Sequence, residues 1–172
     1  IGMIASTAVG VSLDLPAYIH APLAVLAGAL AGGLWGAIAG YLKAARGVNE
    51  VITTIMLNWI ALYFANYILT TFYVPEGQQR SELIKDSASI TIGWLSQMFD
   101  SARLHWGTLL ALLAAVFFYV VLWKTKTGFE LRAVGLNPHA SEYAGMNVNR
   151  NVVNAMFIGG MFAGIGGACE IL

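Results

Sequence analysis

Charged residues are scarce in this sequence. Asp, Glu, Lys and Arg together make up 10% of its 172 residues, whereas 58% of the residues are hydrophobic. Soluble globular domains carry about 25% charged residues, so this composition indicates a membrane protein. The formal net charge is zero, so the chain lacks the basic surplus that is typical of nucleic-acid-binding proteins. Nucleic acid is therefore not expected as a partner.

Cysteine and catalytic motifs are also nearly absent. Cys169 is the single cysteine, so it cannot form an internal disulfide, and its apolar surroundings predict an inert buried thiol. No set of Cys and His residues has metal-ligand spacing, so no metal site is expected. The sequence lacks a G-x-x-x-x-G-K-[ST] phosphate loop, an H-E-x-x-H zinc motif and a nucleophile elbow. We therefore expect no catalytic residue and a function other than catalysis.

The sequence is rich in long apolar runs. A helix needs about 20 apolar residues to cross a bilayer core, so these runs predict an all-α, polytopic transmembrane helical bundle. The first sequence letter is Ile1 and the last run is still apolar at Leu172, and we expect a single transmembrane domain, 1–172, that is a fragment of a larger protein. The expected spans are 1–13 (partial), 22–42, 51–73, 105–123 and 151–172.

Glycine recurs at every fourth position in two of these runs. This spacing places the glycines on one helix face, where GxxxG motifs let two helix backbones approach closely. In lipid such close packing is a main source of helix association. We expect helix packing at Gly28, Gly32, Gly36, Gly40, Gly160 and Gly164.

The run 51–73 carries polar side chains. Thr54 and Asn58 are four residues apart and share one helix face. Hydroxyl and amide groups suit hydrogen bonding to a neutral solute, and no charged residue lies near the span centres to balance a charged one. Together with Asn49 and Glu50 at the start of the run, they are candidates for lining a solute path. The alternative is that these groups join helices by hydrogen bonds.

Basic residues gather in two short polar segments. Segments 43–50 and 124–150 contain six of the nine Lys and Arg residues, and the alternation of spans places both on one side. By the positive-inside rule this side is cytoplasmic, which makes 74–104 an extracytoplasmic loop. Within that loop an amphipathic stripe predicts either a helix along the membrane surface or a partly buried loop helix. The stripe consists of Ile92, Leu95, Phe99 and Ala102.

The cytoplasmic segment 124–150 shows the signals of two short helices. Thr127 and Glu130 match a capping box at the start of the first helix, and Gly135 is expected to end it in a left-handed turn. Asn137 is expected to cap a second helix, with Pro138 in its first turn and Gly145 at its end. Two punctuated helices at a membrane face predict a surface on which a soluble partner docks.

Two sequence blocks resemble a known family. GLWGAIAGYLKAARGVNEVITTIMLNWIA (33–61) and TGFELRAVGLNPHASEYAGMNVNR (127–150), followed by GGMFAGIGGACE, resemble the permease subunits of ABC importers. The branch that they resemble most is that of the nucleoside and simple-sugar permeases, within the group that includes ribose and branched-chain amino-acid permeases. The likeness covers nearly the whole chain, which would be the middle of a permease about twice as long.

The resemblance implies a mechanism and partners. It implies a cell-membrane permease that imports nucleosides or related simple sugars by alternating access and itself binds no cofactor, since ATP binds to a partner subunit. The implied partners are a cytoplasmic ATP-binding subunit, an extracytoplasmic solute-binding protein, a second permease subunit (identical or homologous) and the lipid bilayer. It further implies that the segment 124–150 couples the permease to the ATP-binding subunit. The implied docking residues are Glu130, Arg132, Ala133, Gly135, Asn137, Ala140, Tyr143, Ala144 and Gly145.

Three alternatives stay open at this point. The chain could belong to an ion-coupled secondary transporter, although Glu50 and Glu170 are expected near the membrane surfaces rather than at the midplane where such proteins place carboxylates. It could import another small neutral solute, such as ribose or a branched-chain amino acid. It could also be a membrane scaffold that transports nothing.

Overall fold

The computed structural model describes residues 1–12, 16–73 and 107–171, and these residues form helices and short connections without a strand. The predicted all-α fold is therefore confirmed. The expected loop 74–104 and its amphipathic stripe lie outside the described residues. The helices are α1 (Gly2–Ser12), α2 (Ala17–Arg46), α3 (Glu50–Ile68) with a π-helical turn η1 (Leu69–Tyr73), α5 (Gly107–Lys124), α6 (Lys126–Leu136), α7 (Pro138–Tyr143) and α8 (Val148–Ile171).

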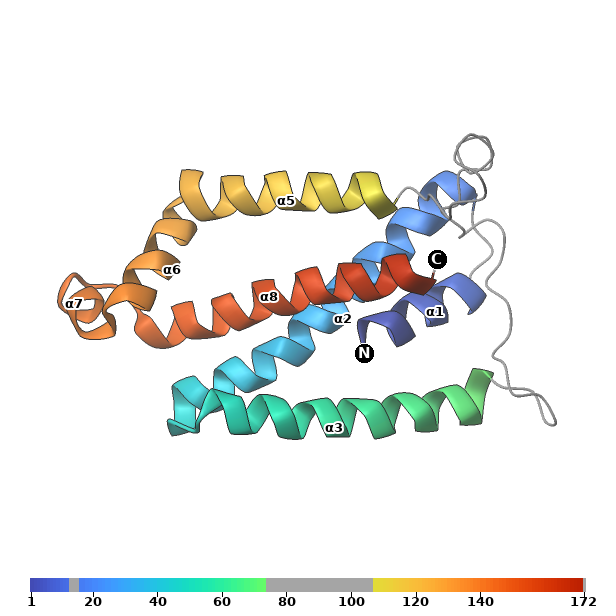
Figure 1. Ribbon diagram of the computed structural model, residues 1–172, viewed down its shortest axis with the longest axis horizontal. Helices are drawn as coiled ribbons and strands as arrows, with labels where there is room; N and C mark the ends of the chain where they lie inside the picture. Colours follow the sequence, from blue (N-terminus) through green and yellow to red (C-terminus); the bar gives the residue numbers. More distant parts are fainter. Residues whose placement is uncertain (13–15, 74–106, 172) are drawn as a thin grey trace.

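Four of these helices are long and apolar enough to cross a membrane. They cover Ile19–Arg46, Glu50–Phe72, Gly107–Lys124 and Val148–Ile171. In Figure 1, α2 and α8 cross in the middle of the bundle, α3 and α5 lie on opposite flanks, and α6 and α7 lie at one end. The chain is thus a multi-pass membrane protein, as the composition indicated.

The helix that contains the expected span 22–42 begins earlier than the sequence suggested, at Ala17. Pro16 stands at the N-cap of α2, and both His20 and Pro22 lie inside the helix. The His20 ring is fully buried, with Nε2 3.0 Å from the carbonyl oxygen of Val9 in α1. Because a carbonyl oxygen can only accept, the ring donates this hydrogen bond. A polar residue inside the bundle is thus satisfied by a neighbouring helix instead of ending α2.

Small residues bring α2 and α8 into backbone contact. A Cβ added to Gly32 would lie 2.8 Å from the Gly164 Cα, and one added to Gly36 would lie 2.5 Å from the Met156 carbonyl oxygen. Real Cβ atoms essentially never approach other atoms so closely, so these positions admit only glycine without a shift of the helices. We call this contact the glycine seam. The glycines that the sequence singled out in it are Gly28, Gly32, Gly36, Gly40, Gly160 and Gly164.

The short helix α1 packs beside this seam. A Cβ at Gly2 would lie 2.7 Å from the Gly164 Cα, and Ser6 Oγ donates a 3.0 Å hydrogen bond to the Ala24 carbonyl oxygen in α2. Sequence reasoning did not single out Gly2 or Ser6, since neither stands in a repeat. The two helices of the seam and α1 therefore form the tightly packed part of the chain.

The two basic segments lie at the same end of the bundle. The turn between α2 and α3 and the helices α6 and α7 lie toward the left end of Figure 1. Gly47, with φ of 64°, ends α2 there and donates a 2.9 Å hydrogen bond to the Lys43 carbonyl oxygen. This arrangement fits the positive-inside assignment of that end to the cytoplasm. The basic residues of the two segments, 43–50 and 124–150, are Lys43, Arg46, Lys124, Lys126, Arg132 and Arg150.

Candidate functional site

The first candidate region is the pair α6–α7, and its start differs from the prediction. Thr125, and not Thr127, is the N-cap of α6: Thr125 Oγ1 accepts a 3.1 Å hydrogen bond from the Gly128 N–H and donates one of 2.5 Å to the Val121 carbonyl oxygen. The predicted capping box of Thr127 and Glu130 was therefore wrong. The physical reason is that the Thr125 hydroxyl serves the end of α5 and the start of α6 together.

The end of α6 also differs. Gly135 was expected in a left-handed turn, but it lies within α6, and the glycines with positive φ among the described residues are Gly47 and Gly145. The helix ends because Asn137 is extended, with φ of −153° and ψ of 101°. A residue before proline disfavours the helical region, so Pro138 fixes this boundary.

The signals of α7 were predicted correctly. Asn137 Oδ1 accepts a 3.1 Å hydrogen bond from the Ala140 N–H, and Pro138 occupies the first turn. Gly145, with φ of 80°, lies just past the helix, and its N–H donates a 2.9 Å hydrogen bond to the Glu142 carbonyl oxygen. The short helix is therefore held at both ends by its own residues.

The residues predicted to dock a partner divide into an outer and an inner group. The outer group lies in residues 135–145, which we call the docking tip. Tyr143 is 95% exposed there, and Leu136, which the sequence reasoning missed, is 88% exposed. An apolar residue directly before Asn-Pro at a helix end was the available signal. The other exposed members of the predicted set are Gly135, Asn137, Ala140, Ala144 and Gly145.

The inner group, Glu130, Arg132 and Ala133, is half-buried and faces other helices of the chain. Glu130 Oε2 accepts a 3.3 Å hydrogen bond from Asn151 Nδ2 in α8, and Glu130 Oε1 lies 3.8 Å from Lys126 Nζ. The Arg132 guanidinium carbon lies 4.2 Å from the centre of the Trp123 ring in α5, a cation–π contact. Glu130 and Arg132 thus join α6 to α8 and α5 in this chain.

The second candidate region is a cavity of about 430 Å³ between α1, α2, α3 and α8. Thr54 and Asn58 both line it, as does Trp35 of α2, which the sequence reasoning did not single out. Thr54 Oγ1 donates to the carbonyl oxygens of Glu50 and Val51 at 2.9 and 3.0 Å. Asn58 makes no hydrogen bond to the part of the chain that the structure describes. Asn58 is exposed where it lines the cavity.

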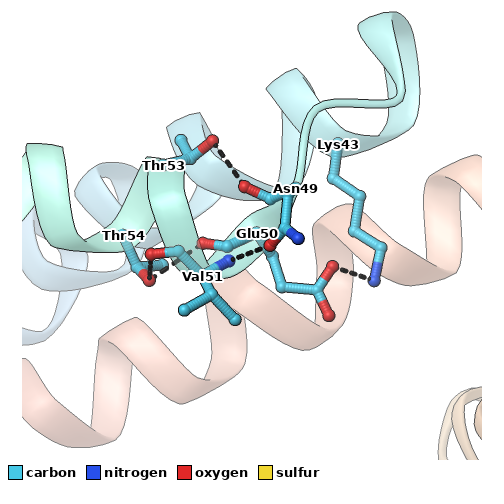
Figure 2. A network of polar contacts seen from close by, with 6 residues as sticks. All are labelled: Lys43, Asn49, Glu50, Val51, Thr53 and Thr54. Carbon is cyan, nitrogen blue, oxygen red and sulfur yellow. Dashed lines mark hydrogen bonds and ion pairs between the residues drawn. The ribbon is translucent and has the colours of Figure 1, made fainter.

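Asn49 and Glu50 have a different place. They lie outside the cavity lining, at the turn that precedes α3. Figure 2 shows the Asn49 side chain accepting a 2.9 Å hydrogen bond from the Val51 N–H, and the Glu50 carboxylate paired with Lys43. Both residues therefore stabilise the turn between α2 and α3, and the structure does not bring them together with Thr54 and Asn58 in the cavity.

A further cavity, of about 500 Å³, lies between α5 and α8, and its lining differs in chemistry. It is formed by small and apolar side chains, with the Cys169 thiol as its most polar group. Such a surface fits lipid chains or another apolar helix and offers nothing that would orient a polar solute. The cavity lined by Thr54 and Asn58 is thus the better candidate for a solute site.

The chain matches a family model along its full length. The model is described as branched-chain amino acid transport system / permease component, and it matches residues 1–172. The chain is 50% identical over 170 residues to the guanosine ABC transporter permease protein NupP of Bacillus subtilis, covering 99% of this chain and 49% of that protein. No solved structure matches the chain.

Two other relatives carry related names. The nucleoside ABC transporter permease protein NupB of Lactococcus lactis subsp. cremoris is 38% identical, over 90% of this chain and 44% of that protein. The glucose ABC transporter permease protein TsgB13 of Haloferax volcanii is 36% identical, over 99% of this chain and 47% of that protein. The chain therefore spans about half the length of the curated relatives that it matches.

Proposed function

Because the chain belongs to the family of branched-chain amino acid transport system permease components, we propose that it is part of the membrane permease of an ATP-driven importer that carries nucleosides across the cell membrane by alternating access. The single observation that supports this most is the 50% identity to a guanosine permease, which extends over 99% of the chain. The family is described as a transport component, which supports a role in transport rather than in catalysis.

The cavity between α1, α2, α3 and α8 supports a nucleoside as the solute. It combines the flat Trp35 ring with the exposed Asn58 amide and the Thr54 hydroxyl. An aromatic ring stacks on a planar base, and an amide both donates to and accepts from a base edge or a ribose hydroxyl. Its volume of about 430 Å³ lies in the usual range of small-molecule sites. We propose that Thr54 and Asn58, with Trp35, line the solute path.

The docking tip supports an ATP-binding subunit as the cytoplasmic partner. It projects from the end of the bundle to which the basic residues assign the cytoplasm, and it exposes Leu136 and Tyr143. Exposed apolar and aromatic side chains at the centre of a patch are typical of protein interfaces. In this proposal ATP binds to the partner, a solute-binding protein delivers the nucleoside from outside, and a second permease subunit completes the path.

The test is uptake by the complete transporter in proteoliposomes. We expect labelled guanosine to enter only with ATP and the ATP-binding subunit present, and we expect imposed ion gradients to have no effect. Competition by a panel of nucleosides, glucose, ribose and leucine identifies the solute class. Uptake that follows an ion gradient without ATP would refute the proposal.

A sugar is the second candidate solute, because the Haloferax volcanii relative is named a glucose permease. An ion-coupled mechanism has less support. In the described spans the carboxylates stand at the ends, Glu50 at the first residue of α3 and Glu170 at the last turn of α8. Carboxylates that couple transport to ions normally lie near the membrane midplane.

A further inference from the structure

The corner between α5 and α6 is tightly built. A Cβ added to Gly128 would collide with the carbonyl groups of Val121 and Leu122, so only glycine fits there. Thr125 bridges the same corner through the hydrogen bonds to Val121 and Gly128. The Arg132–Trp123 contact adds a third link. A displacement of α6 therefore moves the end of α5 with it.

The contact between α6 and α8 differs from this corner because it includes a hydrogen bond between two side chains. It includes one side-chain hydrogen bond, 3.3 Å from Asn151 Nδ2 to Glu130 Oε2, between residues 21 positions apart. Asn151 is 2% exposed, and its Nδ2 also donates to the Asn147 carbonyl oxygen at 3.1 Å. Asn147 in turn caps α8 through a 3.0 Å hydrogen bond from the Arg150 N–H. The carboxylate of α6 is thus tied to the first turns of α8.

The Asn151 amide lowers the folding stability of the chain, so stability does not explain its presence. Its Oδ1 is buried and has no hydrogen-bond partner in the described part of the chain. A buried acceptor without a partner destabilises a fold, whereas an apolar side chain of similar size would fill the same place without that cost. A polar group that breaks this rule is a candidate for a functional role.

Beyond Asn151, α8 leads directly into the glycine seam. The seam fixes α8 to α2 by backbone contact at Gly160 and Gly164, whereas α5 makes few contacts with α8. Interfaces packed this closely move as units rather than deform. A pull on the first turns of α8 is therefore passed to α2, which carries Trp35 on the cavity wall.

We propose that the Glu130–Asn151 hydrogen bond is the joint that passes movement of the docking tip to the α2–α8 pair, and that Asn151 is a positioning residue for transport. This proposal rests on the proposed function, because it assumes that the ATP-binding subunit moves the docking tip. The partner's movement reaches α5 through the rigid corner and reaches α2–α8 through this bond. In this proposal the cavity opens or closes because α2–α8, which forms one wall, is displaced relative to α3, which forms the other.

The first test measures solute transported per ATP hydrolysed by the complete transporter. With Asn151→Leu, which keeps the size and removes the hydrogen bond, we expect that ratio to fall about tenfold, the effect expected for a hydrogen bond to a charged group. Co-purification of the ATP-binding subunit and unstimulated ATP hydrolysis stay at the wild-type level. Loss of co-purification, or an unchanged ratio, would overturn the proposal.

Variants of Glu130 provide the matched comparison. Glu130→Gln keeps an acceptor for Asn151 and is expected to hold the ratio within about twofold of wild type, whereas Glu130→Leu is expected to match Asn151→Leu. The double variant with both leucines should be no worse than either single variant, because both remove one interaction. Equal losses in the Gln and Leu variants, or additive losses in the double variant, would show that no such joint exists.

A second test needs no transported solute. Spin labels at Ala155 on α8 and Val116 on α5, both exposed, report the separation of the two helices in a Cys169→Ala background. We expect a non-hydrolysable ATP analogue to change that distance in the complex and to leave it unchanged with Asn151→Leu. An equal change of distance in the wild-type and Asn151→Leu complexes, or no change in either, would overturn the proposal. A complex whose labels move but which takes up no nucleoside would refute the proposed solute alone.

Discussion

The glycine seam and α3 differ in how much of each helix is buried against the rest of the chain. In α2 a third of the apolar window, 33%, is buried within the chain, against 6% in α3. The sequence of α3 contains no glycine, whereas α2 and α8 carry glycines every fourth residue. Since lipid provides little hydrophobic drive between helices, small residues decide which helices associate closely.

The glycine seam and the exposed surfaces also differ in the chemical groups that they present. The seam consists mainly of backbone groups of α2 and α8 in contact, and its glycines add no polar side chain to the cavity that they line. The exposed surfaces carry the groups that could recognise something else: the Asn58 amide on α3, and Leu136 and Tyr143 on the docking tip. The comparison teaches that in this chain packing and recognition rest on different residues, glycines for the one and polar or aromatic side chains for the other, so that substitutions should separate the two.

The largest effect is expected in the seam. With Gly32→Leu the first added atom would already lie 2.8 Å from the Gly164 Cα, and each overpacked group costs about 1–3 kcal/mol. We expect no folded protein in detergent extracts, as measured by size-exclusion chromatography and thermal unfolding.

Gly166→Ala in α8 is the control for this prediction. Nothing lies within 4 Å of a Cβ at Gly166, so alanine is expected to be neutral or to stabilise by up to about 1 kcal/mol through its helix propensity. A folded Gly32→Leu variant with wild-type thermal stability would contradict the account of the seam.

The next largest effect is expected at the docking tip. Ala140 is exposed on α7, and a tryptophan there would not fit a partner groove shaped for a small residue. We expect Ala140→Trp to abolish solute-stimulated ATP hydrolysis while the permease stays folded. The same substitution at Ala155, exposed on α8 outside the tip, should leave stimulation in place. Normal stimulation with Ala140→Trp would refute the docking assignment.

A moderate effect is expected in the cavity. Asn58→Leu removes an amide that lines the cavity and makes no hydrogen bond to the described residues, so we expect the solute rather than the fold to lose a hydrogen bond. We expect the uptake efficiency, kcat/KM, to fall about tenfold with unchanged assembly. Thr54→Val is expected to have a smaller effect, because its hydroxyl already bonds the helix backbone. Unchanged uptake kinetics with Asn58→Leu would remove this residue from the path.

The smallest effect distinguishes two glycines of the docking tip. Gly135 lies inside α6 with open space around it, so Gly135→Ala should raise stability by up to about 1 kcal/mol. Gly145 has φ of 80°, so Gly145→Ala should lower stability by about 1–2 kcal/mol. Thermal unfolding of the two variants measures this difference in stability. A loss of stability with Gly135→Ala would contradict the helical conformation of Gly135 and would support the left-handed turn that the sequence suggested.

The features that sequence reasoning predicted correctly were local or periodic. Apolar runs of membrane length gave the helical bundle, and Asn137, Pro138 and Gly145 gave α7, since a cap or a turn depends on residues three or four apart. The N-cap of α6 shows where local patterns fail, because it is Thr125 and not the predicted Thr127. Thr127 matched the capping pattern, but the position of the cap depended on where α5 ended, which the local pattern does not contain.

The features that were missed depend on contacts between distant residues. His20 reads as a helix break until Val9 of α1 is known to accept its hydrogen bond. Asn151 reads as one polar residue at the start of an apolar run until α6 brings Glu130 beside it. Trp35 became a candidate only when α3 was seen to place Asn58 on the same cavity. Periodicity indicates which face of a helix is special but not which helix it meets.

The central claim is that the docking tip lies in the cytoplasm and receives the ATP-binding subunit. The most direct measurement labels a cysteine at Tyr143, which is 95% exposed, with a membrane-impermeant thiol reagent in a Cys169→Ala background. We predict labelling in inside-out vesicles, none in right-side-out vesicles, and protection when the ATP-binding subunit is present. Labelling from the outer side, or labelling that the subunit does not reduce, would contradict the account.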